Sequence, residues 1–207
     1  SAGAMAIADL VTSPLAKGLF RRAIIQSGHG AMVRDIDVAQ RLVRKLAKLL
    51  RIAPDADGFV KVDHATAMDA LEKVSKPMAV DLRDSDGFEP VYGISRFIPV
   101  YGDDVLPEKP IEALRKGAGE DIDILIGSNA EEMSLYFVPT GVRRKIPGLL
   151  AWWLLSRSHP QSRKVLKAYG LGRKGGRPGE AMTRAMSDLV FRWPVRQFAK
   201  AHRGRTW

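Results

Sequence analysis

The chain has 207 residues, of which 45% are hydrophobic and 27% charged, with a formal net charge of +10 and no cysteine. This composition is typical of a globular protein and excludes disordered and fibrous chains, while the lack of cysteine excludes disulfides and thiolate metal sites within the chain. No apolar run reaches 18 residues, so we expect no membrane span. A cysteine-free chain fits a reducing compartment and favours a cytoplasmic location.

The first third of the chain alternates helix and strand signals. Good helix formers predict a helix from Ala2 to Leu10, and the apolar run Ala23–Gln26 predicts a buried strand of a parallel sheet. Residues 35–51 have apolar side chains on one helical face and basic ones on the other. We interpret this segment as a surface helix packed on a core; the alternative is a basic helix that binds a membrane or a calmodulin-type partner.

The remaining elements follow in chain order. We expect helices over residues 63–74 and 110–117, irregular structure over 77–110 and a strand over 122–127. Beyond residue 140 we expect helices over 142–157, 161–169 and 181–202, with a basic loop over 172–179. Strands followed by helices predict an α/β fold, although two convincing strands are too few for a sheet covered on both faces.

Three blocks of sequence carry a family resemblance. The chain opens Ser-Ala-Gly-Ala-Met, and residues 13–28 read Ser-Pro-Leu-Ala-Lys-Gly-Leu-Phe-Arg-Arg-Ala-Ile-Ile-Gln-Ser-Gly. Together they resemble the segment that follows the nucleophile elbow of type-B carboxylesterases and cholinesterases. Residues 97–107 resemble the family's Pro-x-x-Asp-Gly-x-x-Leu-Pro segment, and residues 124–132 resemble the strand and turn that carry its acidic triad member. The resemblance implies a partial α/β-hydrolase fold with an incomplete, mostly parallel sheet, in which residues 1–207 form the central part of one domain without its N- and C-terminal portions.

The resemblance assigns Ser1 as the catalytic nucleophile. In an elbow, a sharp strand-to-helix turn exposes the serine oxygen, and the backbone N–H of the next residue, here Ala2, points at the developing oxyanion. The positive end of the helix dipole lies close to the same charge.

Glu132 is assigned as the triad acid, because it maps to the second carboxylate of the family's acidic pair and follows the strongest strand signal. Glu131 suits a solvated position at the start of the next helix. The family usually has glycine where this chain has Met133. Ser27 follows the first strand and matches a family serine that hydrogen-bonds the acid, so we expect a direct bond from Ser27 to Glu132 and convergence of both residues with Ser1.

The substrate pocket is less sharply marked. Tyr136 and Phe137 come directly after the acid and are the better candidates to line it. Trp152 and Trp153, with the leucines around them, fit either a pocket wall or an ordinary buried helix face.

No histidine in the chain suits the triad. His29 and His64 precede Glu132, against the order Ser, acid, His of this fold. His159 and His202 lack the family's Gly-x-x-His context, and we expect both to be exposed to solvent. That context follows a further strand, which the resemblance suggests begins at Thr206-Trp207.

The resemblance therefore implies a carboxylic-ester hydrolase that acts on small uncharged esters without a cofactor or metal, and we expect its 207-residue segment to be inactive alone. The alternatives are a partner-binding relative that has lost catalysis, and an enzyme that uses the α-amino group of Ser1 as its base. The basic residues are scattered and no nucleic-acid-binding motif organises them, so we expect no nucleic acid partner. The oligomeric state stays open.

Overall fold

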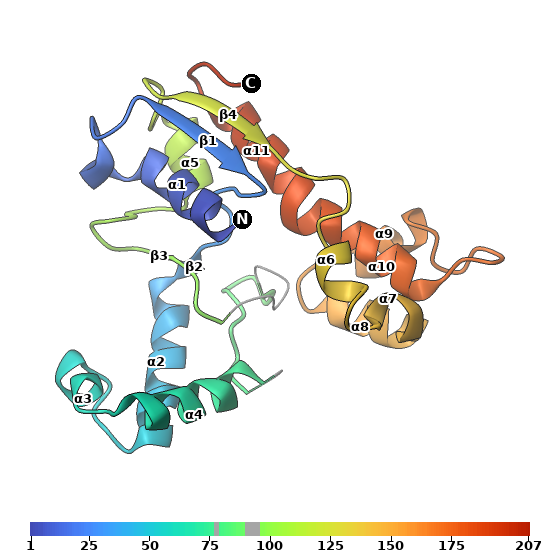
Figure 1. Ribbon diagram of the computed structural model, residues 1–207, viewed down its shortest axis with the longest axis horizontal. Helices are drawn as coiled ribbons and strands as arrows, with labels where there is room; N and C mark the ends of the chain where they lie inside the picture. Colours follow the sequence, from blue (N-terminus) through green and yellow to red (C-terminus); the bar gives the residue numbers. More distant parts are fainter. Residues whose placement is uncertain (77–78, 90–95) are drawn as a thin grey trace.

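The computed structural model describes residues 1–76, 79–89 and 96–207, and Figure 1 shows three groups of elements. Two parallel strands with their covering helices form the part that carries both chain ends. The segment after the first strand forms a second, helical part below it. A third part, also helical, follows the second long strand. A long helix then returns from the third part to the sheet.

The sheet is built on two parallel strands, β1 (Arg22–Gln26) and β4 (Asp123–Gly127). Their register pairs Ala23 with Ile124 and Gln26 with Gly127, so both strands end at the same edge. Thr206 forms a parallel bridge to Ile124, and the backbone of Trp207 exchanges hydrogen bonds with β4. Thr206 and Trp207 thus pair with β4 where the further strand is expected to begin.

Helices cover one face of this sheet: α1 (Ala2–Thr12), α5 (Pro110–Arg115) and α11 (Trp193–Ala201) (Figure 1). The core between them is formed by buried apolar side chains from the helices and the strands, namely Ala8, Val11, Ala23, Ile25, Leu114, Ile122, Ile124 and Phe198. Because side chains alternate along a strand, Ile24 and Leu125 point to the other face, where they are 58% and 50% exposed.

The described residues of the second part contain a minimal parallel pair, β2 (Arg34–Asp35) and β3 (Val100–Tyr101), and the helices α2, α3 and α4. In α2 (Ile36–Leu50) the side chain of Asp35 accepts a hydrogen bond from the N–H of Asp37, an N-cap that satisfies an otherwise free donor. A short helix, α3 (Ala56–Val60), follows. The apolar face of α2 packs on α4 (His64–Ser75) around Leu42, Val74 and Leu82.

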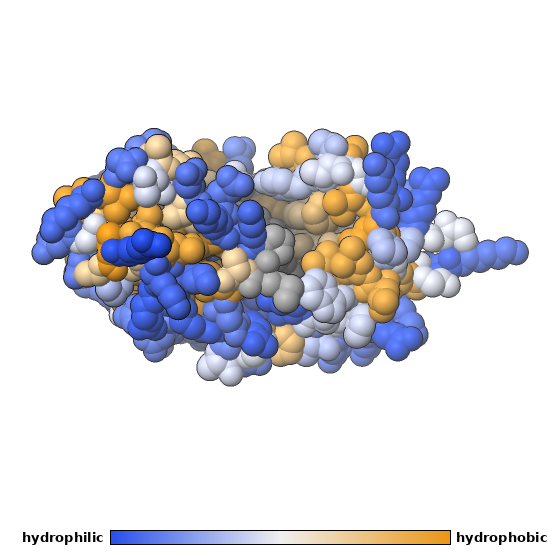
Figure 2. Space-filling view, turned by 90° about the horizontal axis from the view of Figure 1, so that it is seen from below, coloured by the Kyte–Doolittle hydropathy of each residue, from blue (hydrophilic) through white to orange (hydrophobic). Residues whose placement is uncertain are grey.

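The third part is a small helical bundle. Its helices are α6 (Ser134–Phe137), α7 (Val142–Lys145), α8 (Gly148–Ser156), α9 (Ser162–Ala168) and α10 (Pro178–Ser187). Its core includes buried Met133, Leu155, Leu166, Met186 and Phe191. Figure 2 shows apolar side chains gathered over this part, and the exposed apolar residues of α8 are Leu149, Leu150, Trp152, Trp153 and Leu154.

The last helix is continuous but irregular. A π-helical segment, η3 (Asp188–Arg192), joins α10 to α11. Pro194 explains the irregularity, because it has no N–H and its ring crowds the preceding turn. The carbonyl of Val190, four residues earlier, therefore lacks the donor that an α-helix would supply.

Most predicted elements are confirmed within one or two residues. The predicted helix over 142–157 is wrong as a single element, since Pro147 ends α7 and starts α8. The predicted helix over 181–202 begins earlier, at Pro178. Part of the predicted irregular segment, residues 77–78 and 90–95, lies outside the described residues. Within the described ranges, no helix has the length and apolar character needed to cross a membrane.

Candidate active site

The carboxyl ends of β1 and β4 place the predicted site residues at one edge. The last residues of the two strands are register partners, and the N–H of Ser27 donates to the carbonyl of Gly127 at 2.8 Å. Ser27 has a left-handed backbone, with φ of 56°, which turns the chain sharply out of the strand. The turn after β4, which contains Asn129 and Glu132, begins at the same edge.

Asn129 connects the two predicted residues. Its backbone N–H donates to Glu132 Oε1 at 2.7 Å, and its side-chain Nδ2 reaches Glu132 Oε1 at 3.4 Å and Ser27 Oγ at 3.2 Å. No hydrogen bond between these described residues joins Ser27 directly to Glu132, so the expected direct bond is wrong. The two side chains lie close together but Asn129 lies between them. Sequence reasoning missed this residue, although an amide directly after a strand was a signal that could have revealed it.

The two neighbouring glutamates have different surroundings. The Glu131 side chain is 71% exposed, accepts a hydrogen bond from Ser134 and lies 3.9 Å from the guanidinium of Arg143. Glu132 is half-buried and turns back to Asn129. The carboxylate that faces the Ser27 edge is therefore that of Glu132.

The first turn of α1 packs against the same edge. A Cβ added at Gly28 would lie 2.5 Å from the Cβ of Ala4 and 2.7 Å from the backbone nitrogen of Met5, so only glycine permits this approach. Ser1 is the N-cap residue of α1, and its side chain makes no capping hydrogen bond. Its hydroxyl is exposed at the start of the helix, one turn before the contact with Gly28.

His29 belongs to the core and is not a catalytic base. Its Nδ1 accepts a hydrogen bond from the N–H of Ala31 at 3.1 Å, which leaves Nε2–H to donate to the carbonyl of Val190 at 2.6 Å. This is the carbonyl left without a helical donor by Pro194. Burial lowers the pKa of His29 to about 4, against the opposing effect of the bond to Val190, so the ring is neutral at pH 7.

The prediction that His202 is exposed is wrong. The His202 ring is buried. Its Nε2 lies 2.8 Å from the carbonyl oxygen of Gly119, and its Nδ1 lies 2.8 Å from Thr206 Oγ1. The first of these contacts links the end of α11 to the loop before β4. His159 is half-buried, and its Nδ1 accepts from the N–H of Gln161. His64 begins α4, in the second part. Among the described residues, no hydrogen bond joins any of the four histidines to Ser1 or Glu132.

A cavity of about 570 Å³ has Met133, the residue after Glu132, in its lining. Met133 and Phe137 line it, together with Trp153 from α8, whereas Tyr136 lies outside its lining and is 43% exposed. Met5, in the first turn of α1, packs against the core cluster that contains Met133. The residue after Glu132 thus lines the cavity, and the first turn of α1 packs against the apolar core to which Met133 belongs.

In the part of the chain that the structure describes, no group of three or more histidine, aspartate or glutamate side chains could hold a metal ion. What the edge offers chemically is a hydroxyl at a helix N-terminus and a carboxylate held by an amide. A serine hydrolase needs both, and also a histidine between them.

Solved structures that superpose on this chain include carboxylesterases. The Geobacillus stearothermophilus carboxylesterase EST55 at pH 6.2 superposes with a TM-score of 0.73 at 26% identity, over 98% of this chain and 40% of that chain. A structure of PNB esterase gives a TM-score of 0.75 at 25% identity, over 100% of this chain and 40% of that one. The fold is therefore part of an α/β-hydrolase fold.

Curated relatives agree with the structures. The chain is 27% identical to para-nitrobenzyl esterase of Bacillus subtilis (strain 168) over 209 residues, covering 100% of this chain and 40% of the relative. It is 31% identical to acetylcholinesterase of Electrophorus electricus over 144 residues, covering 67% of this chain and 21% of the relative. The chain thus spans less than half the length of these relatives. Because the model of the Carboxylesterase family matches residues 1–207, from end to end, the chain belongs to the carboxylesterase family.

Proposed function

We propose that this chain supplies the nucleophile and the acid of a carboxylic-ester hydrolase that acts on small uncharged esters. The observation that carries the proposal is the shared edge: Asn129 holds the Glu132 carboxylate beside Ser27, while Gly28 receives the first turn of the helix that starts at Ser1. Family membership supports an esterase-type activity.

In this proposal Ser1 attacks the ester carbonyl. The N–H of Ala2 and the positive end of α1 stabilise the oxyanion that forms. A histidine takes the proton from Ser1 and returns it to the leaving alcohol, and Glu132 orients that histidine, with Asn129 and Ser27 holding the carboxylate. Neither a metal nor an organic cofactor takes part.

The histidine must come from polypeptide outside these 207 residues, because the four histidines of the chain are engaged elsewhere or remote. Residues 1–207 are then the central part of one α/β-hydrolase domain, and the chain alone is inactive. The cavity bounded by Met133 and Phe137 takes the alkyl part of the ester. Tyr136, which is not part of the cavity lining, contacts substrate from the open side.

A chimera tests the proposal. The matching 209-residue segment of Bacillus subtilis para-nitrobenzyl esterase is replaced by this chain, and hydrolysis of p-nitrophenyl acetate is measured. We expect activity in the chimera, and its loss by at least roughly a thousandfold in Ser1→Ala and Glu132→Gln.

The matched control is Glu131→Gln, which removes the neighbouring, exposed carboxylate and should retain activity. Activity in the Glu131 variant together with inactivity in the Glu132 variant shows that the chimera folds and that the acid is correctly assigned. The reverse result would overturn the assignment. A folded chimera without any activity would favour a non-catalytic, partner-binding role; one relative, 30% identical over 128 residues, is named inactive carboxylesterase-like protein VdtD.

A further inference from the structure

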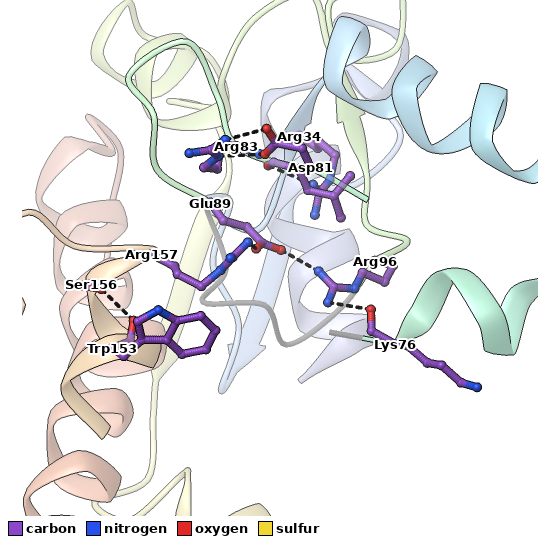
Figure 3. A network of polar contacts seen from close by, with 10 residues as sticks. Arg34, Lys76, Asp81, Arg83, Glu89, Arg96, Trp153, Ser156 and Arg157 are labelled. Carbon is purple, nitrogen blue, oxygen red and sulfur yellow. Dashed lines mark hydrogen bonds and ion pairs between the residues drawn. The ribbon is translucent and has the colours of Figure 1, made fainter. Parts of the chain in front are cut away.

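The cavity that Met133 lines has a charged wall that ester hydrolysis does not require. The Glu89 side chain, 4% exposed, lies between two guanidinium groups: Arg96 Nη1 is 2.8 Å from Glu89 Oε1 and Arg157 Nη2 is 3.6 Å from Glu89 Oε2 (Figure 3). All three residues line the cavity, and Lys145 does so as well. Glu89 is the single acid in the lining formed by described residues.

The two arginines are held differently. Arg96 is 10% exposed and is fixed from both sides, because it also donates to the carbonyl of Lys76 at 3.4 Å. Arg157 is 27% exposed, its distance to Glu89 is long, and its guanidinium lies 5.8 Å from the centre of the Trp153 ring. Within the described residues, Glu89 and the Trp153 ring are the contacts of this guanidinium. Arg157 therefore keeps donors available on the cavity side.

The charge balance of the wall favours an anion. One carboxylate lies between two guanidinium groups, and Lys145 adds a further positive side chain to the lining. An uncompensated charge beside apolar surroundings is costly. The rest of the lining is largely apolar and is formed by Phe137, Ile146, Leu150, Leu154, Leu155 and Met186. A ligand that matches both features has an alkyl chain and a planar anionic head that a guanidinium fork can bind.

We infer that this cavity binds medium-chain alkyl carboxylates, with the chain against α8 and α10 and the carboxylate on Arg157. The inference goes beyond the proposed function, because it adds an anionic carboxylate ligand to the small uncharged esters proposed as substrates. The binding itself needs no reaction and is measured on the chimera described above.

Three probes of equal chain length separate the contributions: octanoate, 1-octanol and octylammonium. Calorimetry should show octanoate binding about tenfold more tightly than octanol, the gain of one charge-assisted hydrogen bond, and octylammonium binding most weakly. Methyl NMR locates the ligand, because Met133, Met182 and Met186 line the cavity whereas Met68 is exposed on α4. Octanoate should shift the first three signals and leave that of Met68 unchanged.

Variants test the role of Arg157. Arg157→Gln should abolish the preference for octanoate over octanol and Arg157→Lys should retain most of it, while Glu89 keeps its 2.8 Å partner Arg96 in both. The matched control is Arg163→Gln, the same change on the exposed surface of α9. Equal affinity for octanoate and octanol in the parent chimera, tighter binding of octylammonium, or an unchanged preference in Arg157→Gln would each overturn the inference.

The two proposals fail separately. Ser1→Ala removes the proposed nucleophile and should leave octanoate binding unchanged. An inactive but folded chimera combined with Arg157-dependent octanoate binding contradicts the esterase and supports the carboxylate site. An active chimera combined with equal binding of octanoate and octanol does the opposite.

Discussion

At the scale of single residues, the site is organised by hydrogen bonds to the Glu132 carboxylate. A carboxylate that orients a histidine must keep one oxygen free and the other fixed, because its own rotation would misalign the base. Asn129 fixes Oε1 through its backbone N–H and its side chain. The same amide holds Ser27, so three side chains from two strand ends form one unit.

Replacing Asn129 with aspartate should therefore lower activity. The substitution removes the Nδ2 donor, places a second negative charge beside Glu132 and leaves the backbone bond of 2.7 Å in place. We expect kcat/KM of the chimera to fall roughly tenfold, the equivalent of about 1.4 kcal/mol, with KM little changed. Ser128→Ala, a neighbouring exposed position, is the control. An Asn129→Asp chimera as active as the parent would contradict the positioning role.

The residue scale is also where sequence and structure diverge most. The two strand signals were enough to predict that Ser27 and Glu132 lie at one edge of the sheet, whereas their convergence with Ser1 stays a prediction. The amide of Asn129 after the second strand was a signal that it lies at this edge, but its bridge to both side chains depends on the rotamer of an exposed amide. The burial of His29 was equally hidden, because its partner Val190 lies 161 residues away and lost its helical donor to Pro194.

At the scale of elements, local patterns predicted the long helices and both main strands. They failed where elements are short or interrupted. The strands β2 and β3 have two residues each, too few to show a periodicity, and the helix α3 has five residues. The predicted helix over 142–157 ignored Pro147, which cannot continue a helix through the residue before it.

The contact between α1 and β1 gives a second prediction. Gly28→Ala forces a Cβ to within 2.5 Å of Ala4, so α1 must shift, and overpacking of this kind costs about 1 to 3 kcal/mol. Gly3→Ala is the matched control in the same helix: nothing lies within 4 Å of the added Cβ, and alanine favours the helix by up to about 1 kcal/mol. Urea unfolding should show the first variant destabilised and the second stabilised. Equal effects would contradict the close approach.

At the scale of the whole molecule, two buried titratable groups, Asp9 and His29, have opposite effects on how the stability of the fold changes with pH. Asp9 is 6% exposed, and neither carboxylate oxygen has a hydrogen-bond partner among the described residues. Burial raises its pKa to about 7. His29 is 2% exposed, and burial lowers its pKa to about 4. Both shifts mean that folding stabilises the neutral form.

The consequences for stability have opposite signs. As pH rises from about 4 to 7, the unfolded chain ionises Asp9 while the folded chain keeps it protonated, so stability falls with pH. As pH falls from about 6.5 to 4, the unfolded chain protonates His29 while the folded chain keeps it neutral, so stability falls in the other direction. Between about pH 4 and 6.5 the two slopes of stability against pH cancel, because folding takes up one proton at Asp9 and releases one at His29.

Single substitutions should expose each slope. In Asp9→Asn, the His29 contribution remains, and the free energy of unfolding should be roughly 2 kcal/mol greater at pH 6.5 than at pH 4.5, relative to the parent chain. In His29→Gln, which keeps a donor for Val190, the Asp9 contribution remains and the difference should reverse in sign with a similar size. Asp104→Asn, an exposed carboxylate, should leave the parent profile as it is. Urea titrations at the two pH values measure all four chains, and parallel profiles for Asp9→Asn and His29→Gln would contradict the assignment of these opposing groups.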